Sequence, residues 1–162
     1  MKSIQIETTR FGRVDVPLAA FVTIPRGLYV LEKTHSYCLL PHDEAGHFQW
    51  LQAMEEPALA MLMTDPFPLF PNYEVQISDP AAELLQVTTP ADVTVFVTVT
   101  LDRSSRQLYA NLLGPLILNH RASLGAQVIQ DSGRYTTRHL ILERPLEEPQ
   151  AAGYPESVPL PC

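Results

Sequence analysis

Apolar and polar residues alternate along much of the chain, at the spacing typical of strands that bury one face. The longest run spans residues 93–101, where every second residue from Val93 to Leu101 is aliphatic and threonine occupies most positions between them. Successive side chains of a strand point to opposite faces, so this run predicts a long strand with one buried face. Alternation on both sides of Gly12 likewise predicts a hairpin between residues 4 and 16.

Eight further apolar runs are short, and they are separated by proline, glycine, asparagine and aspartate, which favour turns. Many short strands at close spacing predict an all-β, mainly antiparallel fold, which the pattern alone leaves as either a sandwich or a barrel. The eight runs span residues 21–24, 37–40, 48–51, 59–64, 73–77, 116–118, 127–129 and 139–142.

Two segments carry the start signals of short helices. Asp79 can accept hydrogen bonds from the open amides of a helix, and Pro80 suits the first helical position, so one or two turns are expected over residues 79–85. Thr89 and Pro90 repeat this pattern and predict a single turn. Neither segment presents a long amphipathic face.

The last part of the chain differs from the rest. Five prolines interrupt residues 143–162, where apolar periodicity is weak. Proline removes amide donors, and a segment with little apolar surface does not offset the entropy lost on ordering. A chain of 162 residues has the size of one domain. We therefore predict a single domain over residues 1–146 and a proline-rich, disordered tail over residues 147–162.

Charge is unevenly distributed along the sequence. The formal net charge is -7, so counterion release from phosphates does not drive binding, and direct nucleic-acid binding is not expected. No lysine or arginine lies between Lys33 and Arg103. We expect this interval to form an acidic surface that attracts basic partners, although carboxylates also serve simply to solvate a β-surface. The interval contains ten carboxylates, namely Asp43, Glu44, Glu55, Glu56, Asp65, Glu74, Asp79, Glu83, Asp92 and Asp102.

The sequence shows no membrane or export segment. Its most apolar run, residues 58–63, is far shorter than the roughly 20 residues of a membrane span, and the N-terminal alternation differs from the apolar core of a signal peptide. We expect a cytoplasmic protein with no membrane partner. Cys38 lies in an apolar run and is expected to be buried, whereas Cys162 is expected to be an exposed thiol, with no disulfide between them.

One cluster of side chains has metal-binding chemistry. His42, Asp43, Glu44 and His47 lie close together, but no further ligand follows at the spacing of a known metal site, which favours a surface loop. Ser123 lacks the glycine two positions earlier that a nucleophile elbow requires. The sequence thus gives no positive support for an enzyme. The alternative left open is a small-molecule-binding or metal-dependent hydrolytic β-barrel enzyme that uses the histidine loop.

Two segments punctuated by proline and asparagine, residues 65–74 and 109–119, resemble the signature of FliW, a family of bacterial flagellar assembly factors. The family's further motifs follow in order over residues 4–142, and their ordered combination is specific although each motif alone is weak. They are Arg10-Phe11-Gly12, Ile24 to Leu28 with Glu32, Phe48 to Gln52, Gly125 to Ile129, and Tyr135 with Arg138-His139.

The chain departs from the family pattern at several positions. Val30 and Leu31 stand where such proteins usually carry Gly-Phe, and Asn72 stands where they carry Asp. We expect the scaffold to tolerate these changes and partner affinity to depend on them. The other departures are Tyr109, Gly114 and Gln130, which replace the more usual Thr, Ala and an aliphatic residue.

The resemblance implies a small, closed or partly closed β-barrel with one or two short helices, which binds proteins, catalyses nothing and needs no cofactor or metal. It also implies two protein partners. One is CsrA, a homodimeric RNA-binding repressor of flagellin translation that the protein sequesters, and the other is flagellin, which captures the protein in turn. Because CsrA binds RNA and so presents basic surface, an acidic face would complement it.

We predict partner contacts in the acidic interval and in the two signature segments. Four residues leave a second interpretation open. Asn111 and Asn119 can hold turns beside a sheet edge, while Trp50 and Tyr73 can be interface anchors or core residues, with the core favoured for Trp50. The predicted partner-binding residues are Glu55, Glu56, Asp65, Phe70, Asn72, Tyr73, Asp79, Asn111 and Asn119.

Overall fold

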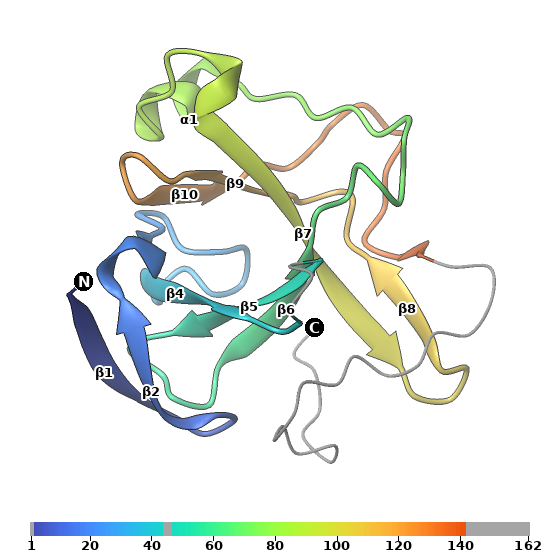
Figure 1. The fold of residues 1–162 in the computed structure, drawn as a ribbon. Coiled ribbons are helices and arrows are strands. Elements are labelled where there is room, and N and C mark those ends of the chain that lie inside the picture. Colours follow the sequence, from blue (N-terminus) through green and yellow to red (C-terminus); the bar gives the residue numbers. More distant parts are fainter. Residues whose placement is uncertain (1, 44–46, 142–162) are drawn as a thin grey trace.

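Seven strands close into a β-barrel (Figure 1). The structure is a computed structural model that describes residues 2–43 and 47–141. The strands follow one another in the order β7-β6-β5-β4-β3-β10-β9, and β9 returns to pair with β7. The prediction of a barrel is therefore confirmed, and a sandwich is excluded. The barrel strands are β3 (Phe21–Thr23), β4 (Ser36–Pro41), β5 (Phe48–Ala53), β6 (Ala60–Thr64), β7 (Val93–Asp102), β9 (Leu116–Asn119) and β10 (Leu124–Gln127).

The barrel is mainly antiparallel, as predicted. Among the strand pairs that the structure describes, only β3 and β10 run parallel, joined at Thr23 and Leu124. β7 is long enough to extend beyond the barrel, because its first half pairs with β9 and its second half pairs with β8 (Gln107–Ala110). β11 (His139–Leu140) pairs with β8 and completes a side sheet.

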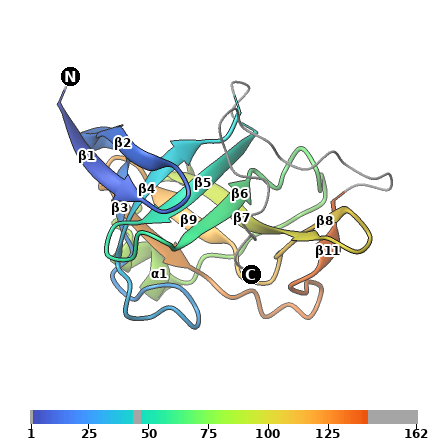
Figure 2. The same ribbon diagram turned by 90° about the horizontal axis from the view of Figure 1, so that it is seen from below.

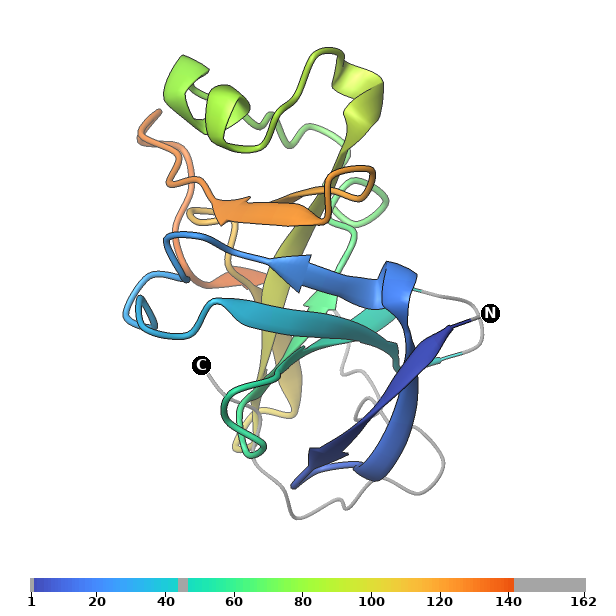
Figure 3. The ribbon, with the colours of Figure 1, turned by 90° about the vertical axis from the view of Figure 1, so that its left-hand side faces the viewer.

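The predicted N-terminal hairpin is confirmed and lies against the outside of the barrel. β1 (Ser3–Thr8) pairs with β2 (Gly12–Pro17). Figures 1 and 3 place this hairpin and α1 (Asp79–Leu84) at opposite ends of the barrel. Figure 2 shows the side sheet of β8 and β11 on the side of the molecule away from the hairpin. The barrel thus carries separate additions on its outer surface.

One apolar cluster fills the barrel interior. Tyr37, Leu51 and Phe96 belong to it, each from a different strand. The core side chains pack closely against the backbone of Gly125, where an added Cβ would lie 2.7 Å from Leu118 Cδ2. A side chain at this position would have to displace the core, which explains a glycine in the middle of β10.

Two further clusters cover the outside of the barrel. Trp50 and Val97 belong to the cluster under the hairpin, and Ile117 belongs to the cluster under α1. Trp50 is only 2% exposed, which confirms its predicted place in a core. The predicted long strand and its apolar face are thus confirmed, with Val97 and Val99 buried on that face, which lies on the outer side of the barrel. Phe96 lies on the opposite face, among the threonines, and is buried in the barrel interior.

Three strand predictions differ from the structure. Residues 73–77 form an extended segment and not a strand, because the Gln130 side chain pairs with the amide and carbonyl of Gln76 at 2.7 and 3.0 Å where a neighbouring strand would otherwise pair. The strand predicted at residues 127–129 lies earlier, at β10. The sequence pattern also missed β8.

The helix α1 begins one residue earlier than predicted. Ser78 is its N-cap and accepts a hydrogen bond from the Ala81 amide at 3.3 Å, so Asp79 occupies the first turn. The turn predicted after Thr89 is confirmed as the 3-10 helix η2 (Pro90–Asp92), and a second one, η1 (Leu18–Ala20), precedes β3. Within the described residues, none of the helices has the length and apolar character that crossing a membrane requires.

Some predictions concern residues outside the described part of the chain. These are Glu44, Cys162 and the tail at residues 147–162. Cys38 is described, and its complete burial confirms the prediction made for it. Burial raises the pKa of this thiol to about 11, so it stays protonated at neutral pH.

The connection from β3 to β4 contains a residue in an unfavourable backbone conformation. Val30 has a φ of 71°, which lies in the left-handed region that β-branched residues rarely adopt. The same loop contains Gly27, with a φ of 67°. Position 30 is where the family pattern has glycine, a residue that enters this region freely. The departure noted in the sequence therefore has a measurable structural consequence.

Replacing Val30 with glycine is expected to stabilise the protein by about 1 kcal/mol. Relief of the left-handed strain, ~1–2 kcal/mol, outweighs the extra entropy that glycine gives the unfolded chain. Thermal unfolding followed by circular dichroism should show a melting temperature higher by about 3 °C. Val30→Ala is the control and should gain little, because alanine is also disfavoured at this φ. A glycine variant that melts at or below the wild-type temperature would contradict this account.

Candidate functional site

A groove of about 600 Å³ opens on the outer face of β7 beside α1. Residues 93–95 of β7 form one side, and segments 65–67 and 75–77 face it together with the link from α1 to η2. Because α1 has only six residues, it covers this face of β7 incompletely and leaves apolar side chains within reach of a partner. The lining residues are Asp65, Phe67, Val75, Ile77, Ala82, Val87, Thr88, Thr89, Pro90, Val93, Thr94 and Val95.

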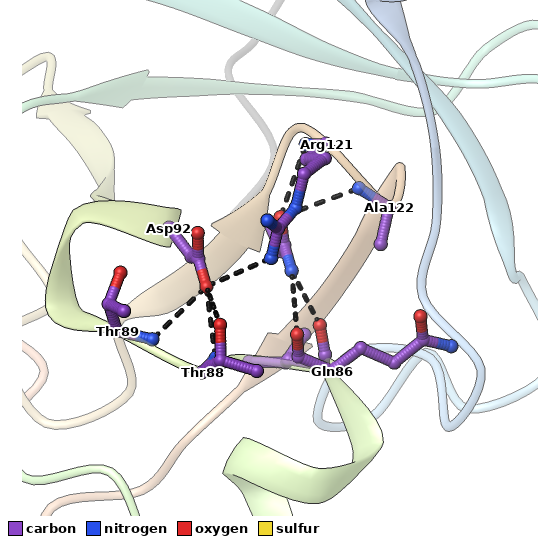
Figure 4. Close-up of polar contacts among 8 residues, drawn as sticks. Gln86, Thr88, Thr89, Asp92, Arg121 and Ala122 are labelled. Carbon is purple, nitrogen blue, oxygen red and sulfur yellow. Dashed lines mark hydrogen bonds and ion pairs between the residues drawn. The ribbon is translucent and has the colours of Figure 1, made fainter.

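The link between α1 and η2 is fixed by a polar network at the edge of the groove (Figure 4). The Asp92 carboxylate accepts hydrogen bonds from the Thr88 amide at 2.9 Å, the Thr88 hydroxyl at 3.0 Å and the Thr89 amide at 3.1 Å, and it pairs with the Arg121 guanidinium at 3.0 Å. The two amide hydrogen bonds hold the pKa of Asp92 below its ordinary value. This wall of the groove is therefore preformed.

Asn119 ties the same link to the turn that follows β9. Its buried side chain donates from Nδ2 to the Leu85 carbonyl at 2.8 Å and the Gln86 carbonyl at 3.3 Å. Its Oδ1 accepts from the Arg121 amide at 3.1 Å and the Ala122 amide at 3.4 Å. One side chain thus holds the end of α1 and a turn of the barrel together.

Three exposed carboxylates lie in or beside the groove. Asp65 lines it, and Asp79 and Glu83 stand on α1, whose Ala82 also lines it. None of the three carboxylates forms an ion pair with another residue of the described ranges. Asp65 Oδ1 accepts only a local hydrogen bond, from the Phe67 amide at 3.0 Å. A basic partner would meet negative charge and an apolar lining in one place.

The acidic interval of the sequence does not form a single acidic surface, so that expectation was wrong. Barrel closure brings arginines from beyond residue 103 against it. Glu74 pairs with Arg134 at 3.3 Å, and Asp102 pairs with Arg138 at 3.2 Å, in addition to the pair at Asp92. Arginines far along the chain thus offset part of the negative charge, which a count along the sequence does not reveal.

Glu55 and Glu56 lie far from Asp65. They follow β5, whereas Asp65 follows β6, and the antiparallel register of the two strands places these ends on opposite sides of the barrel. Glu55 Oε1 accepts hydrogen bonds from the His35 amide at 3.0 Å and the Ser36 amide at 2.8 Å, which hold its pKa below the ordinary value. The predicted acidic contacts therefore fall into two groups, and only one of them borders the groove.

The signature segment at residues 65–74 is held in place by aromatic contacts. The Tyr73 hydroxyl donates to the Leu112 carbonyl at 2.7 Å, and its ring meets the Tyr135 ring edge-on at 4.8 Å. Burial raises the pKa of Tyr73. Phe70 packs on the His139 ring at 6.2 Å. Phe70 and Tyr73 thereby fix the segment that carries Asp65 into the groove wall.

Asn111 and Asn72 differ in their surroundings. Asn111 Oδ1 accepts from the Leu113 amide at 3.1 Å and the Gly114 amide at 3.0 Å, so it holds the turn before β9. Asn72 is exposed on the signature segment. The interpretation in which Asn111 and Asn119 hold turns is confirmed. Direct partner contact stays a prediction for all nine residues, and the buried Tyr73 and Asn119 would act mainly by positioning others.

His42 is not on the surface, where the sequence placed its loop. It is 6% exposed, and its Nδ1 accepts a hydrogen bond from Trp50 Nε1 at 3.1 Å. Burial lowers the pKa of His42 and favours the neutral ring that can accept this bond. Across the residues with described positions, His, Cys, Asp and Glu side chains form no group of three that could hold a metal ion.

Sequence reasoning missed most of the groove. Val93 and Val95 were expected to be buried. The sequence did hold one sign that they are accessible, because a helix of one or two turns cannot cover a strand of this length. Val87 and Ile77 lie on irregular connections, where apolar periodicity gives no information about which side chains converge.

The fold and the groove define a class of protein, a small and mainly antiparallel β-barrel with a preformed apolar groove. Unpaired carboxylates lie beside the groove, and such a surface suits a protein partner. Comparison with known proteins identifies the family. The profile of the family described as FliW protein matches residues 5–141. The chain belongs to the FliW family of flagellar assembly factors, and the resemblance seen in the sequence is confirmed.

Individual relatives and a solved structure agree. The flagellar assembly factor FliW of Moorella thermoacetica is 34% identical over 149 residues, which cover 91% of this chain and 94% of that protein. The flagellar assembly factor FliW of Treponema pallidum is 34% identical over 139 residues, covering 86% of this chain and 92% of that protein. A crystal structure of the flagellar assembly factor FliW has a TM-score of 0.79 at 29% identity and covers 88% of this chain and 100% of that chain.

Proposed function

We propose that the protein is a cytoplasmic CsrA antagonist. It binds CsrA, relieves the repression of flagellin translation by CsrA, and is captured by flagellin in a partner exchange. It acts by binding alone, without catalysis and without a cofactor. The proposal rests on membership of the FliW family and on the two protein partners that the resemblance implies.

The observation that carries the proposal is the groove with its unpaired carboxylates. Asp65, Asp79 and Glu83 offer negative charge around an apolar lining, and an RNA-binding protein such as CsrA presents basic surface. Complementary charge favours encounter and correct orientation, and the apolar lining gives the contact its desolvated centre. The net charge of -7 disfavours direct competition for the RNA itself. The protein should therefore act on CsrA and not on the message.

The test is a calorimetric titration of the purified protein with CsrA and, separately, with flagellin of the same organism. The proposal expects saturable binding to each. A mixture of all three should contain less of the CsrA complex than the two-component mixture does, because flagellin captures the protein. Absence of binding to CsrA would reject the antagonist role while leaving the family membership intact.

Association with CsrA is expected to slow as salt rises. Exposed charges are screened beyond a Debye length of ~10 Å at 0.1 M salt, and steering by complementary charge raises association rates by about tenfold or more. Stopped-flow mixing in dilute and in concentrated salt measures the rate constant. A rate constant that stays the same across this series would remove the charged groove as the point of encounter.

A further inference from the structure

The loop between β3 and β4 presents apolar side chains on the surface, away from the groove. Tyr29 is 72% exposed and Val30 is 78% exposed. Ile129, on the segment after β10, is 48% exposed and lines with Tyr29 a hollow of about 140 Å³. Val30 adjoins Tyr29 in the loop, and we call these three exposed apolar side chains the patch.

This loop is held by a buried anchor and by hydrogen bonds although it is exposed. Leu28 is 5% exposed and anchors the loop in the barrel interior. The Tyr29 amide donates to Gln127 Oε1 at 2.7 Å, and the Glu32 carbonyl lies 2.6 Å from His35 Nε2. Contacts on a loop already held in place cost little ordering entropy, and aromatic anchors dominate binding energy. Strain such as that at Val30 persists mainly where it serves a function.

The loop and its flanks carry two cations and one carboxylate, a small excess of positive charge. Arg26 and Lys33 flank the loop, both are exposed, and neither forms an ion pair with a described residue. Glu32 is the only carboxylate of the loop, and its Oε1 accepts a hydrogen bond from the Val30 amide at 3.3 Å. Two unpaired cations beside an apolar patch favour a partner segment that carries apolar residues and carboxylates.

The patch and the groove share α1 as a common wall. Ala81 and Leu84 of α1 line a hollow of about 260 Å³ together with Arg26 and Gly27, and Ala82 lines the groove. A partner seated on the loop therefore meets the same short helix that borders the groove. Occupation of one surface can bear on the other through this helix.

We propose that the Gly27–Glu32 loop and Ile129 form a second protein-contact surface, distinct from the groove, for an apolar segment carrying carboxylates. This inference rests on the proposed function, in which CsrA is basic and suits the groove. The excess positive charge of the loop disfavours such a partner, so we assign the surface to the second partner of the proposed function, flagellin. Because α1 borders both surfaces, a partner seated on one of them would oppose the seating of a partner on the other.

The test compares two double variants in titrations with CsrA and with flagellin. Tyr29→Ser/Val30→Gly removes the patch while relieving the backbone strain, so loss of folding does not explain a loss of binding. Ile4→Thr/Leu18→Ser is the matched control, because Ile4 and Leu18 are also exposed apolar residues, at 48% and 45%. The loop variant should bind flagellin at least tenfold more weakly and CsrA with unchanged affinity. The control should bind both partners as the wild type does.

Two results would overturn the inference while the proposed function stands. One is unchanged flagellin binding by the loop variant, and the other is a loss of CsrA binding alone. A wild-type protein that binds neither partner would reject the proposed function and this inference together.

Discussion

Replacing Asp65 and Glu83 together with lysine should weaken CsrA binding at least a hundredfold and leave the fold intact. Lysines would place positive charge where the proposal expects a basic partner, and like charges facing each other across an interface oppose association by several kcal/mol. Exposed substitutions alter stability by about 0.5 kcal/mol or less, and loss of the Asp65 hydrogen bond to the Phe67 amide adds about 1 kcal/mol. Calorimetry measures the affinity, and thermal unfolding measures the stability.

The matched control changes the same amount of charge elsewhere. Asp15 and Glu56 are exposed, and neither lines the groove. Glu56 belongs to the second group of predicted acidic contacts, so this variant also separates the two groups. If the groove is the CsrA site, Asp15→Lys/Glu56→Lys should keep most of the CsrA affinity, because it then alters only the long-range field. If this control loses affinity and the groove variant keeps it, the contact lies at the opposite end of the β5–β6 hairpin, and the groove is not the CsrA site.

Asn119→Ala should lower the free energy of unfolding by about 3 kcal/mol. The substitution leaves the buried Leu85 carbonyl and the Arg121 amide without their Asn119 partner, and each buried polar group left unsatisfied costs ~1–3 kcal/mol. The melting temperature should fall by about 10 °C for a chain of this size. Thermal or urea unfolding measures the change.

Asn111→Ala is the comparison for this result. Asn111 is only partly buried, so water can replace its side-chain oxygen, and the expected loss is about 1 kcal/mol. Equal melting temperatures for Asn119→Ala and the wild type would show that Asn119 does not hold α1.

Most strands could be predicted from the sequence because their apolar residues alternate with polar ones, whereas the choice of a barrel over a sandwich came from the family resemblance. β7 is visible in the alternation of residues 93–101, and the hairpin is visible on both sides of Gly12. Residues 73–77 misled the prediction, because their apolar alternation is real but their backbone pairs with the distant Gln130 side chain. Local periodicity does not show which group, strand or side chain, satisfies a backbone amide.

The candidate site was only partly predictable. Asp65 and Asp79 were identified from charge and motif, and they do lie in or beside the groove. The pairing of Asp92 with Arg121 could not be predicted, because the two residues meet only when β7 pairs with β9 and closes the barrel. Val30 was noted as a departure from the family pattern, but its φ of 71° and its exposure belong to the folded loop.

The central claim, that the protein antagonises CsrA by binding it, is tested most directly by release of RNA. A fluorescently labelled flagellin message bound to CsrA is titrated with the protein, and anisotropy reports the bound RNA. The account predicts that anisotropy falls to the value of free RNA, that the protein alone leaves the RNA unchanged, and that the Asp65→Lys/Glu83→Lys variant releases little. RNA that stays bound to CsrA at saturating wild-type protein would contradict the account.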